Sequence, residues 1–172
     1  MNEFIDNKDG TVSDLTTGLM WQQEPPKSTM NWHEAIKYCS GLTLGGLDDW
    51  RLPTLPELFS LIDYSREIPA IDPIMGATKV SSGYWSSTTR AGYTDGAWLV
   101  GFYYGGVYGG YKSSSFYVRA VRVATVNQCS FDPHSNLICV RGPHCPYQMG
   151  SRKISELKDK EQTEWISNGE GE

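Results

Sequence analysis

The sequence predicts an α+β fold in which two helices flank a small antiparallel sheet, followed by an irregular C-terminal extension. Two segments within residues 31–62 combine helix-capping motifs with apolar residues at helical spacing. Short alternating apolar segments and glycine-containing turns lie on either side of them. Because the chain has 172 residues, we expect one main domain over residues 1–123 and an appendage over residues 124–172.

The first expected element is a pair of short strands joined at Asp9-Gly10, a dipeptide typical of tight turns. Residues 4–5 and 11–12 are placed to pair across it. The same stretch also resembles a calcium loop, but Ile5 and Thr16 would then occupy two positions that need carboxylates. We therefore favour a turn over a metal site.

Residues 31–42 are expected to form the first helix. Asn31 can cap this helix, and Glu34 lies three residues later, as a capping box requires. Apolar residues at three- and four-residue spacing give it one buried face: Trp32, Ala35, Ile36, Cys39 and Leu42. Gly45-Gly46 ends the segment. His33 has no cysteine or histidine near it in the sequence apart from Cys39, so we interpret it as a surface residue.

A second helix is expected to start at Thr54. This residue forms a second capping box with Glu57, and Pro56 is tolerated in the first turn. The buried side of the helix is expected to consist of four apolar residues, which are Leu58, Phe59, Leu61 and Ile62. We interpret the apolar stripes of both helices as core packing.

Residues 92–117 differ in composition from the rest of the chain. Their 26 positions contain 7 Gly, 6 Tyr and 3 Ser. Tyrosine supplies rigid amphipathic contact area, and serine and glycine supply adaptable polar contacts, so this composition is typical of antibody-type binding surfaces. A glycine- and tyrosine-rich hairpin without any partner would have the same composition, and composition alone does not separate the two interpretations.

An apolar pattern with a period of two runs through this segment. Alternation would place Trp98, Val100 and Phe102 on one face of a strand and Leu99, Gly101 and Tyr103 on the other. Residues 117–123 are predicted to be a final strand in the same sheet as residues 97–103. We expect a set of apolar side chains to be buried as the scaffold of this region: Trp98, Val100, Phe102, Val107 and Val118.

Five separated motifs occur in an order that resembles one known family. They are Gly18-Leu19-Met20-Trp21, Ala35 to Cys39, Asp49 to Thr54 with Glu57-Leu58, Tyr84 to Thr88, and Tyr117 to Arg122. Over residues 4–122 the chain resembles the C-terminal domain family of the bacterial collagen-like adhesins, the Lcl C-terminal family. The resemblance implies a C-type lectin-like fold, similar to that of the formylglycine-generating enzymes. It also implies a relation to the variable proteins of diversity-generating retroelements, in which template adenines are randomised.

Randomising the two adenines of an AAY codon gives Asn, Tyr, Ser, Gly and Asp among others, but neither Lys nor Trp. Lys112 and Trp98 would then be fixed scaffold positions. The resemblance implies ligand-binding, variable positions within a region of about 90–117, which are Tyr93, Asp95, Leu99, Gly101, Tyr103, Tyr104, Gly106, Tyr108, Tyr111, Ser113, Ser114 and Phe116. We expect these side chains to be mostly exposed on one contiguous face, with the four tyrosines from 103 to 111 providing most of the contact area.

These features predict a ligand-binding, receptor-recognition protein rather than an enzyme. Its partner would be a protein or glycan target on a cell surface, and its location would be the surface of a virus particle or of a cell. The alternative is a non-diversified adhesin domain that binds polysaccharide or a host surface. The final predicted strand lacks the cysteines that formylglycine-generating enzymes use. The only Glu-Pro dipeptide, Glu24-Pro25, has no calcium-lectin partner motif near it, and no Ser/His/Asp spacing is found.

Charge and hydropathy argue against two further classes. The chain has 15 Lys and Arg against 20 Asp and Glu, a net charge of −5, and no basic cluster, which argues against nucleic acid as a partner. No run of about 18 apolar residues is present, so we expect no membrane insertion. The first ten residues lack the regions of a signal peptide, so we expect a protein that is not exported by that route or a chain given without its leader.

The segment after the last predicted strand contains a group of cysteines and histidines, which are Cys129, His134, Cys139, His144 and Cys145. They have the side chains needed for a structural zinc ion, although their spacing lacks a paired CxxC motif. One disulfide that leaves Cys39 unpaired, two disulfides that include it, or free thiols are the alternatives. No cofactor is required for the predicted function. Residues 152–172 are rich in charge, and we expect residues 167–172 to be disordered.

Overall fold

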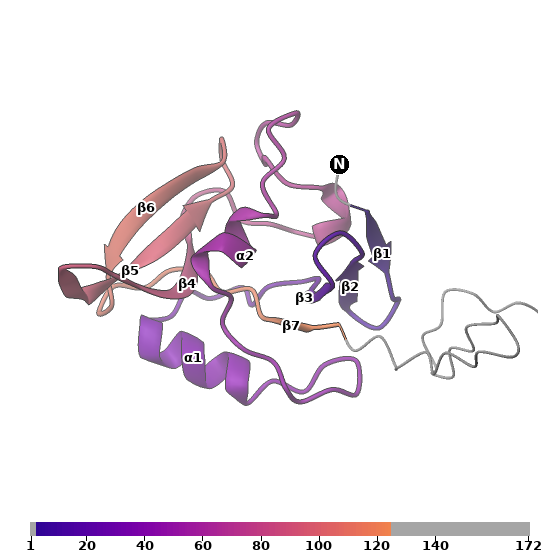
Figure 1. The fold of residues 1–172 in the computed structure, drawn as a ribbon, viewed down its shortest axis with the longest axis horizontal. Coiled ribbons are helices and arrows are strands. Elements are labelled where there is room, and N and C mark those ends of the chain that lie inside the picture. Colours follow the sequence, from indigo (N-terminus) through magenta and orange to yellow (C-terminus); the bar gives the residue numbers. More distant parts are fainter. Residues whose placement is uncertain (1–2, 125–172) are drawn as a thin grey trace, which may run out of the picture. The chain divides into compact units, whose positions relative to one another are not determined.

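The computed structural model describes residues 3–124 of the chain, and within them it shows two antiparallel sheets and two α-helices (Figure 1). The strands are β1 (Phe4–Asp6), β2 (Thr11–Asp14), β3 (Leu19–Gln22), β4 (Tyr84–Arg90), β5 (Tyr93–Gly101), β6 (Gly106–Tyr111) and β7 (Val121–Val123). The helices are α1 (Trp32–Ser40), α2 (Leu55–Phe59) and the short 3₁₀ helix η1 (Pro73–Met75). The α+β class is confirmed. Of the predicted extension over 124–172, only residue 124 lies within the described residues.

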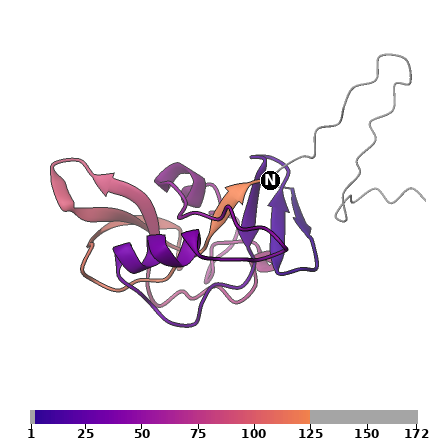
Figure 2. The same ribbon diagram turned by 90° about the horizontal axis from the view of Figure 1, so that it is seen from below.

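The two sheets lie on opposite sides of the domain in both ribbon views (Figures 1 and 2). One sheet has the strand order β1-β2-β3-β7 and the other has the order β4-β5-β6. The predicted N-terminal hairpin is present, with Phe4 opposite Asp14 and Ile5 opposite Ser13. Its loop is stabilised by the Asp9 carboxylate, which accepts hydrogen bonds from the backbone N–H and the hydroxyl of Thr11.

Both predicted capping boxes are present, so both helices begin where the sequence indicates. Asn31 caps α1 with Glu34, and Thr54 caps α2 with Glu57. Helix α1 ends at Ser40, with Gly41 as its C-cap, rather than at Gly45-Gly46; the Gly41 N–H donates the last helical bond, to the Lys37 carbonyl at 3.0 Å. The expected apolar faces are too broad for such short helices: Ile36 and Phe59 are 37% and 40% exposed.

The three-stranded sheet is covered on both faces by separate apolar clusters. Trp85 and Leu99 are cross-strand partners and pack with Ala35 and Cys39 of α1. Tyr84 and Val100 are the next pair and point to the opposite face, where they pack with Leu58 of α2 and with Trp21 of the other sheet. Because side chains alternate between faces, a strand buried on both sides carries a continuous apolar run, as residues 97–100 do.

The prediction that residues 117–123 form a strand in the same sheet as residues 97–103 is wrong. Tyr117 bridges to Tyr84 beside the three-stranded sheet, but the chain then continues into the other sheet, where β7 pairs with β3. Only 121–123 form a regular strand. The Ala120 carbonyl accepts a backbone hydrogen bond from Gln22, and Val121 at the start of β7 exchanges two with Arg51, which alternation along the strand does not reveal. The segment 117–123 therefore joins the two sheets.

Arg119 fixes this joining segment from within the core. Its side chain is fully buried, and Nη1 donates to the backbone carbonyls of Gln22 at 2.7 Å and Gln23 at 2.6 Å. Nη2 donates to the Thr78 hydroxyl at 2.8 Å. Burial lowers the pKa of Arg119, and the ring of Tyr84, 5.9 Å from the guanidinium carbon, provides a cation–π contact.

Two ion pairs complete the joining region. Arg122 forms a bidentate pair with Asp49, and Arg51 forms a bidentate pair with Glu57. The Arg51 guanidinium lowers the pKa of Glu57 to about 2. The backbones of Arg51 and Val121 also exchange two hydrogen bonds of 2.9 Å. Two of the sequence motifs, around Trp50 and around Ala120, are therefore direct neighbours in space.

We predict that Arg119→Met lowers the free energy of unfolding by about 2–4 kcal/mol, because it leaves buried carbonyl acceptors without a donor. The matched change Arg51→Met, in a pair that is 42% exposed on the arginine side, should cost about 1 kcal/mol or less. Urea denaturation of both variants measures the two values. Equal losses would contradict the role given to Arg119.

Candidate functional site

The predicted variable residues lie on the β4–β5–β6 sheet and the loop that follows it, with unequal exposure. Seven are exposed: Tyr93, Asp95, Tyr103, Tyr104, Tyr108, Tyr111 and Ser113. Gly106, Ser114 and Phe116 are half-buried, and Leu99 and Gly101 are buried. Most of the expected surface positions are thus on the surface.

Leu99 and Gly101 contradict the expected exposure. The prediction assumed that the face of β5 carrying Leu99 meets solvent, whereas α1 and Trp85 cover it and leave Leu99 only 2% exposed. Phe116 is also tied to this cluster, since its ring meets the Trp85 ring edge to face at 4.9 Å. Leu99, Gly101 and Phe116 therefore pack as part of the scaffold.

The predicted scaffold is confirmed for three of its five members. Val100, Phe102 and Val118 are fully buried. Trp98 is only half-buried, and Val107 is 37% exposed. Both exceptions lie toward β6, which is an edge strand and has a neighbour on one side only.

The exposed residues fall into two groups at opposite ends of the β5–β6 hairpin. Gly96 pairs with Tyr111 at one end and Gly101 pairs with Gly106 at the other. The first end carries Tyr93, Asp95, Tyr111 and Ser113, and the turn at the second end carries Tyr103 and Tyr104. A six-residue strand such as β6 spans about 20 Å, so the expected single contiguous face is in fact two areas with Tyr108 between them.

The glycines of this hairpin have structural roles that composition did not reveal. Gly92 and Gly105 adopt φ of +78° at the two turns, a conformation that favours glycine. Gly101 and Gly106 lie beneath the Tyr108 ring, and a Cβ on Gly101 would come within 2.9 Å of Cε2 of that ring. Part of the glycine and tyrosine content is therefore explained by side chains that lie flat across the backbone.

Two adjacent hollows lie at the end of the hairpin that carries Tyr93 and Tyr111. The larger measures about 630 Å³ and is lined by Asn31, His33, Glu34, Thr94, Asp95, Tyr111, Lys112 and Ser113. The smaller measures about 120 Å³ and is lined by Arg90, Tyr93, Asp95, Gly96, Gly109, Gly110 and Tyr111. Asp95 and Tyr111 line both hollows, so the two form one candidate binding site.

Lys112 attaches the N-terminal end of α1 to the hairpin beside the larger hollow. Its Nζ donates to the Thr89 hydroxyl at 2.8 Å and to the Thr94 carbonyl at 2.9 Å, and it lies 4.2 Å from the centre of the Trp32 ring. The Lys112 carbonyl accepts a hydrogen bond from the Trp32 N–H. Lys112 is therefore a structural residue of the site.

Arg90 is a site residue that the sequence reasoning missed. Its guanidinium carbon lies 5.0 Å from the centre of the Tyr93 ring and 5.2 Å from that of the Trp98 ring. Arg90 ends β4 and is paired with Tyr93, so a cation next to an aromatic-rich hairpin turn was the available signal. The pairing register that brings Trp98 to the same place is visible only in the fold.

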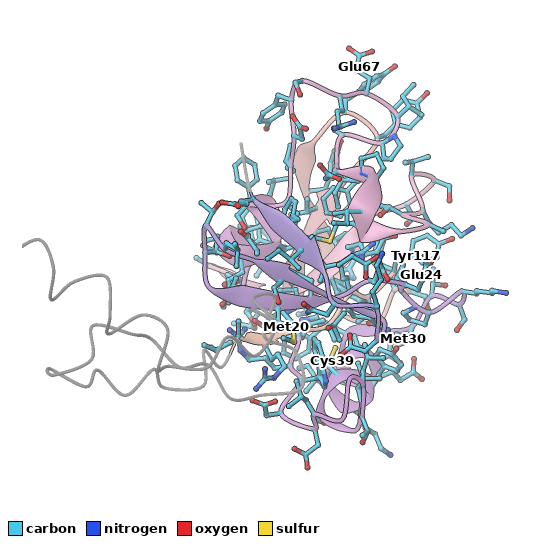
Figure 3. All side chains as sticks on the ribbon, turned by 90° about the vertical axis from the view of Figure 1, so that its right-hand side faces the viewer. Met20, Glu24, Met30, Cys39, Glu67 and Tyr117 are labelled. Atoms are coloured by element: carbon cyan, nitrogen blue, oxygen red, sulfur yellow. The ribbon has the colours of Figure 1, made fainter. Side chains whose placement is uncertain are left out.

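The second end of the hairpin carries a group of tyrosines, and no hollow is described there. The Tyr64 hydroxyl donates to the Gly105 carbonyl at 3.1 Å, and the Tyr103 and Tyr104 rings meet edge to face at 4.4 Å. Glu67, from the loop between α2 and η1, lies at one extremity of the domain in Figure 3, whereas Cys39 lies in the interior nearer the other. This area is rich in exposed tyrosine.

The structure bears on the predicted metal site and on the expected lack of membrane insertion only within residues 3–124. The five candidate zinc ligands from Cys129 to Cys145 lie outside the described residues. Within residues 3–124, no group of His, Cys, Asp and Glu is placed to hold a metal ion, and Cys39 is a buried free thiol whose pKa is raised by burial to about 12. No helix in that same range is long and apolar enough to cross a bilayer.

We predict that the double variant Tyr93→Ala/Tyr111→Ala changes the free energy of unfolding by about 0.5 kcal/mol or less, because these rings are 62% and 67% exposed. Leu99→Ala should cost about 2–5 kcal/mol, because it leaves a cavity between the sheet and α1. Denaturant titration of the two variants makes the comparison. A large loss in the tyrosine variant would assign these rings to the core.

Comparison with known proteins gives one positive result. A search of curated proteins finds no match to the chain. The model of the Lcl C-terminal domain matches residues 10–122, which include strands β2 to β6, the first two residues of β7 and both α-helices. The chain belongs to the Lcl C-terminal domain family.

Proposed function

We propose that this domain is a ligand-binding module of the adhesin type that recognises a protein or glycan target on a cell surface. The observation that carries the proposal is the pair of adjacent hollows that share Asp95 and Tyr111 at the exposed end of the hairpin. Tyr93 lines the smaller hollow and is 62% exposed. Exposed tyrosines beside a concave surface are among the residues that commonly dominate binding energy.

The rigidity of the site supports a binding role. The six cross-strand pairs of β5 and β6 hold one wall, and the contacts of Lys112 with Thr94 and Trp32 hold α1 against it. A site that is ordered before the ligand arrives does not lose the free energy of ordering a loop on binding.

We also propose that the role is binding rather than catalysis, on a C-type lectin-like scaffold at the surface of a virus particle or a cell. Asn31 and Glu34 are occupied in the cap of α1, and Lys112 is occupied in scaffold contacts. Their engagement in structural contacts supports a role in shaping the hollow. Family membership supports the adhesin-like assignment.

A second candidate is a diversified display surface of the retroelement type. Seven of the twelve implied positions are exposed, which favours this candidate. The burial of Leu99 and Gly101 limits variation there to residues that keep the packing with Trp85 and Tyr108.

The DNA that flanks the gene tests the second candidate. We predict a near-identical template repeat beside a reverse transcriptase gene, with adenines opposite the codons of the exposed positions such as Tyr93, Tyr103 and Tyr111. Sequencing of the locus makes the observation. A locus without such a repeat would leave the fixed adhesin domain as the function.

The location of the binding site is tested by paired double variants. Ligands would first be selected with the full chain from a displayed random peptide library and from a glycan array. Tyr93→Ala/Tyr111→Ala should weaken binding of the selected ligands by at least about tenfold, as loss of contact hot spots does. Tyr64→Ala/Tyr104→Ala, at the other end of the hairpin, should change it by about twofold or less. The reverse ranking would place the site at the other end.

A further inference from the structure

The small hollow has an arginine at its wall that is held without an acidic partner. The Arg90 guanidinium lies near the Tyr93 and Trp98 rings, and its Nε is buried with no hydrogen-bond acceptor within residues 3–124. None of the ion pairs among these described residues involves Arg90. An aromatic contact holds a guanidinium by its face, which leaves the in-plane donors of the terminal nitrogens Nη1 and Nη2 available, whereas Nε of Arg90 is buried.

The backbone beneath Arg90 is adapted to this placement. A Cβ on Gly109 would lie 2.5 Å from Nη1 and 2.7 Å from Cζ of Arg90, and a Cβ on Gly96 would lie 3.3 Å from its Cδ. Glycine at these positions lets the side chain lie flat across β5 and β6. The guanidinium is therefore positioned at the hollow by its neighbours.

We propose that Arg90 binds a single carboxylate, an Asp or Glu side chain of a peptide segment in a protein ligand, with Tyr93 and Tyr111 contacting the flanking residues of that segment. This inference rests on the proposed function and names the chemical class of ligand for the same site. A planar guanidinium with free donors matches a carboxylate in a bidentate manner.

The surroundings favour one carboxylate over a polyanionic chain. The hollow measures about 120 Å³, and it offers one cation, since Lys112 lies on the wall of the larger hollow and is engaged by two oxygen acceptors. Asp95 lines the same hollow and repels additional negative charge. The chain as a whole carries a net charge of −5, which disfavours an extended anion further.

Asp95 gives the proposed ligand a second requirement. Asp95 lines the same hollow as Arg90, and a carboxylate only accepts hydrogen bonds, so it favours a ligand that presents a donor next to its acid. A peptide backbone N–H adjacent to a Glu side chain meets this requirement. Peptide segments therefore fit the pair formed by Arg90 and Asp95.

Titration of the ¹⁵N-labelled full chain with acetyl-Gly-Glu-Gly-amide tests the proposal directly. We expect a saturable shift of the Arg90 Nε–H signal and of the Gly109 amide, and no such shift with the matched peptide acetyl-Gly-Gln-Gly-amide. Equal shifts with the two peptides would overturn the proposal. Tighter binding of a heparin hexasaccharide than of the Glu peptide at Arg90 would also overturn it, in favour of a sulfated glycan.

Three variants separate the guanidinium geometry from charge. Arg90→Gln and Arg90→Lys should each weaken binding of the Glu peptide by about tenfold or more, because a lysine keeps the charge but lacks the planar fork. Gly109→Ala, which keeps Arg90 but displaces it, should do the same. Lys27→Gln, which removes an exposed cation that lines neither hollow, is the control and should have no effect. Melting temperatures of all variants identify any that fail to fold.

The two proposals fail in different ways. Library ligands that lose binding with Tyr93→Ala/Tyr111→Ala, but not with Arg90→Gln or Gly109→Ala, leave the proposed function standing and overturn the carboxylate proposal. Selected peptides that show no enrichment of Asp or Glu also overturn the carboxylate proposal alone. Ligands that are insensitive to both sets of changes overturn the location of the site itself.

Discussion

The burial of Arg119 is the interaction on which the rest of the domain depends. Its guanidinium donates to two carbonyls next to β3 and to a hydroxyl of the loop before β4, so one side chain links both sheets. A buried cation needs hydrogen-bond acceptors, and here the two terminal nitrogens of Arg119 have them while its Nε has none within residues 3–124, so the surrounding backbone must keep those acceptors in place. The segment 117–123 can then pair with β4 at its start and with β3 at its end.

This arrangement determines where the domain can offer a binding site. The inner part of the β4–β5–β6 sheet is covered on one face by α1 and on the other by α2 and the second sheet. In the outer part, beside the N-terminal end of α1, the rings of Tyr93 and Tyr111 stay exposed. The proposed site thus lies on the continuation of a doubly covered sheet, which positions it without burying it.

Glycine and tyrosine serve two purposes in the hairpin. Exposed rings such as those of Tyr93 and Tyr111 provide contact area, whereas the Tyr108 ring lies over two glycines and packs on the backbone. Arg90 uses Gly109 in the same way. A composition typical of binding surfaces is therefore explained here in part by packing, and the geometry shows which tyrosine rings are left exposed for the proposed binding role.

The sequence by itself determined the α+β class, the starts of both helices and the N-terminal hairpin, because capping boxes and turn residues act over a few positions. Alternation also identified Val100 and Phe102 as core residues. Only the tertiary structure decided that Leu99 is buried, that β7 joins the other sheet and that Arg90 stacks against Trp98. These outcomes depend on which distant segments pack together. A two-residue apolar period in the sequence shows that side chains alternate between the two faces of a strand, but it does not show what covers each face.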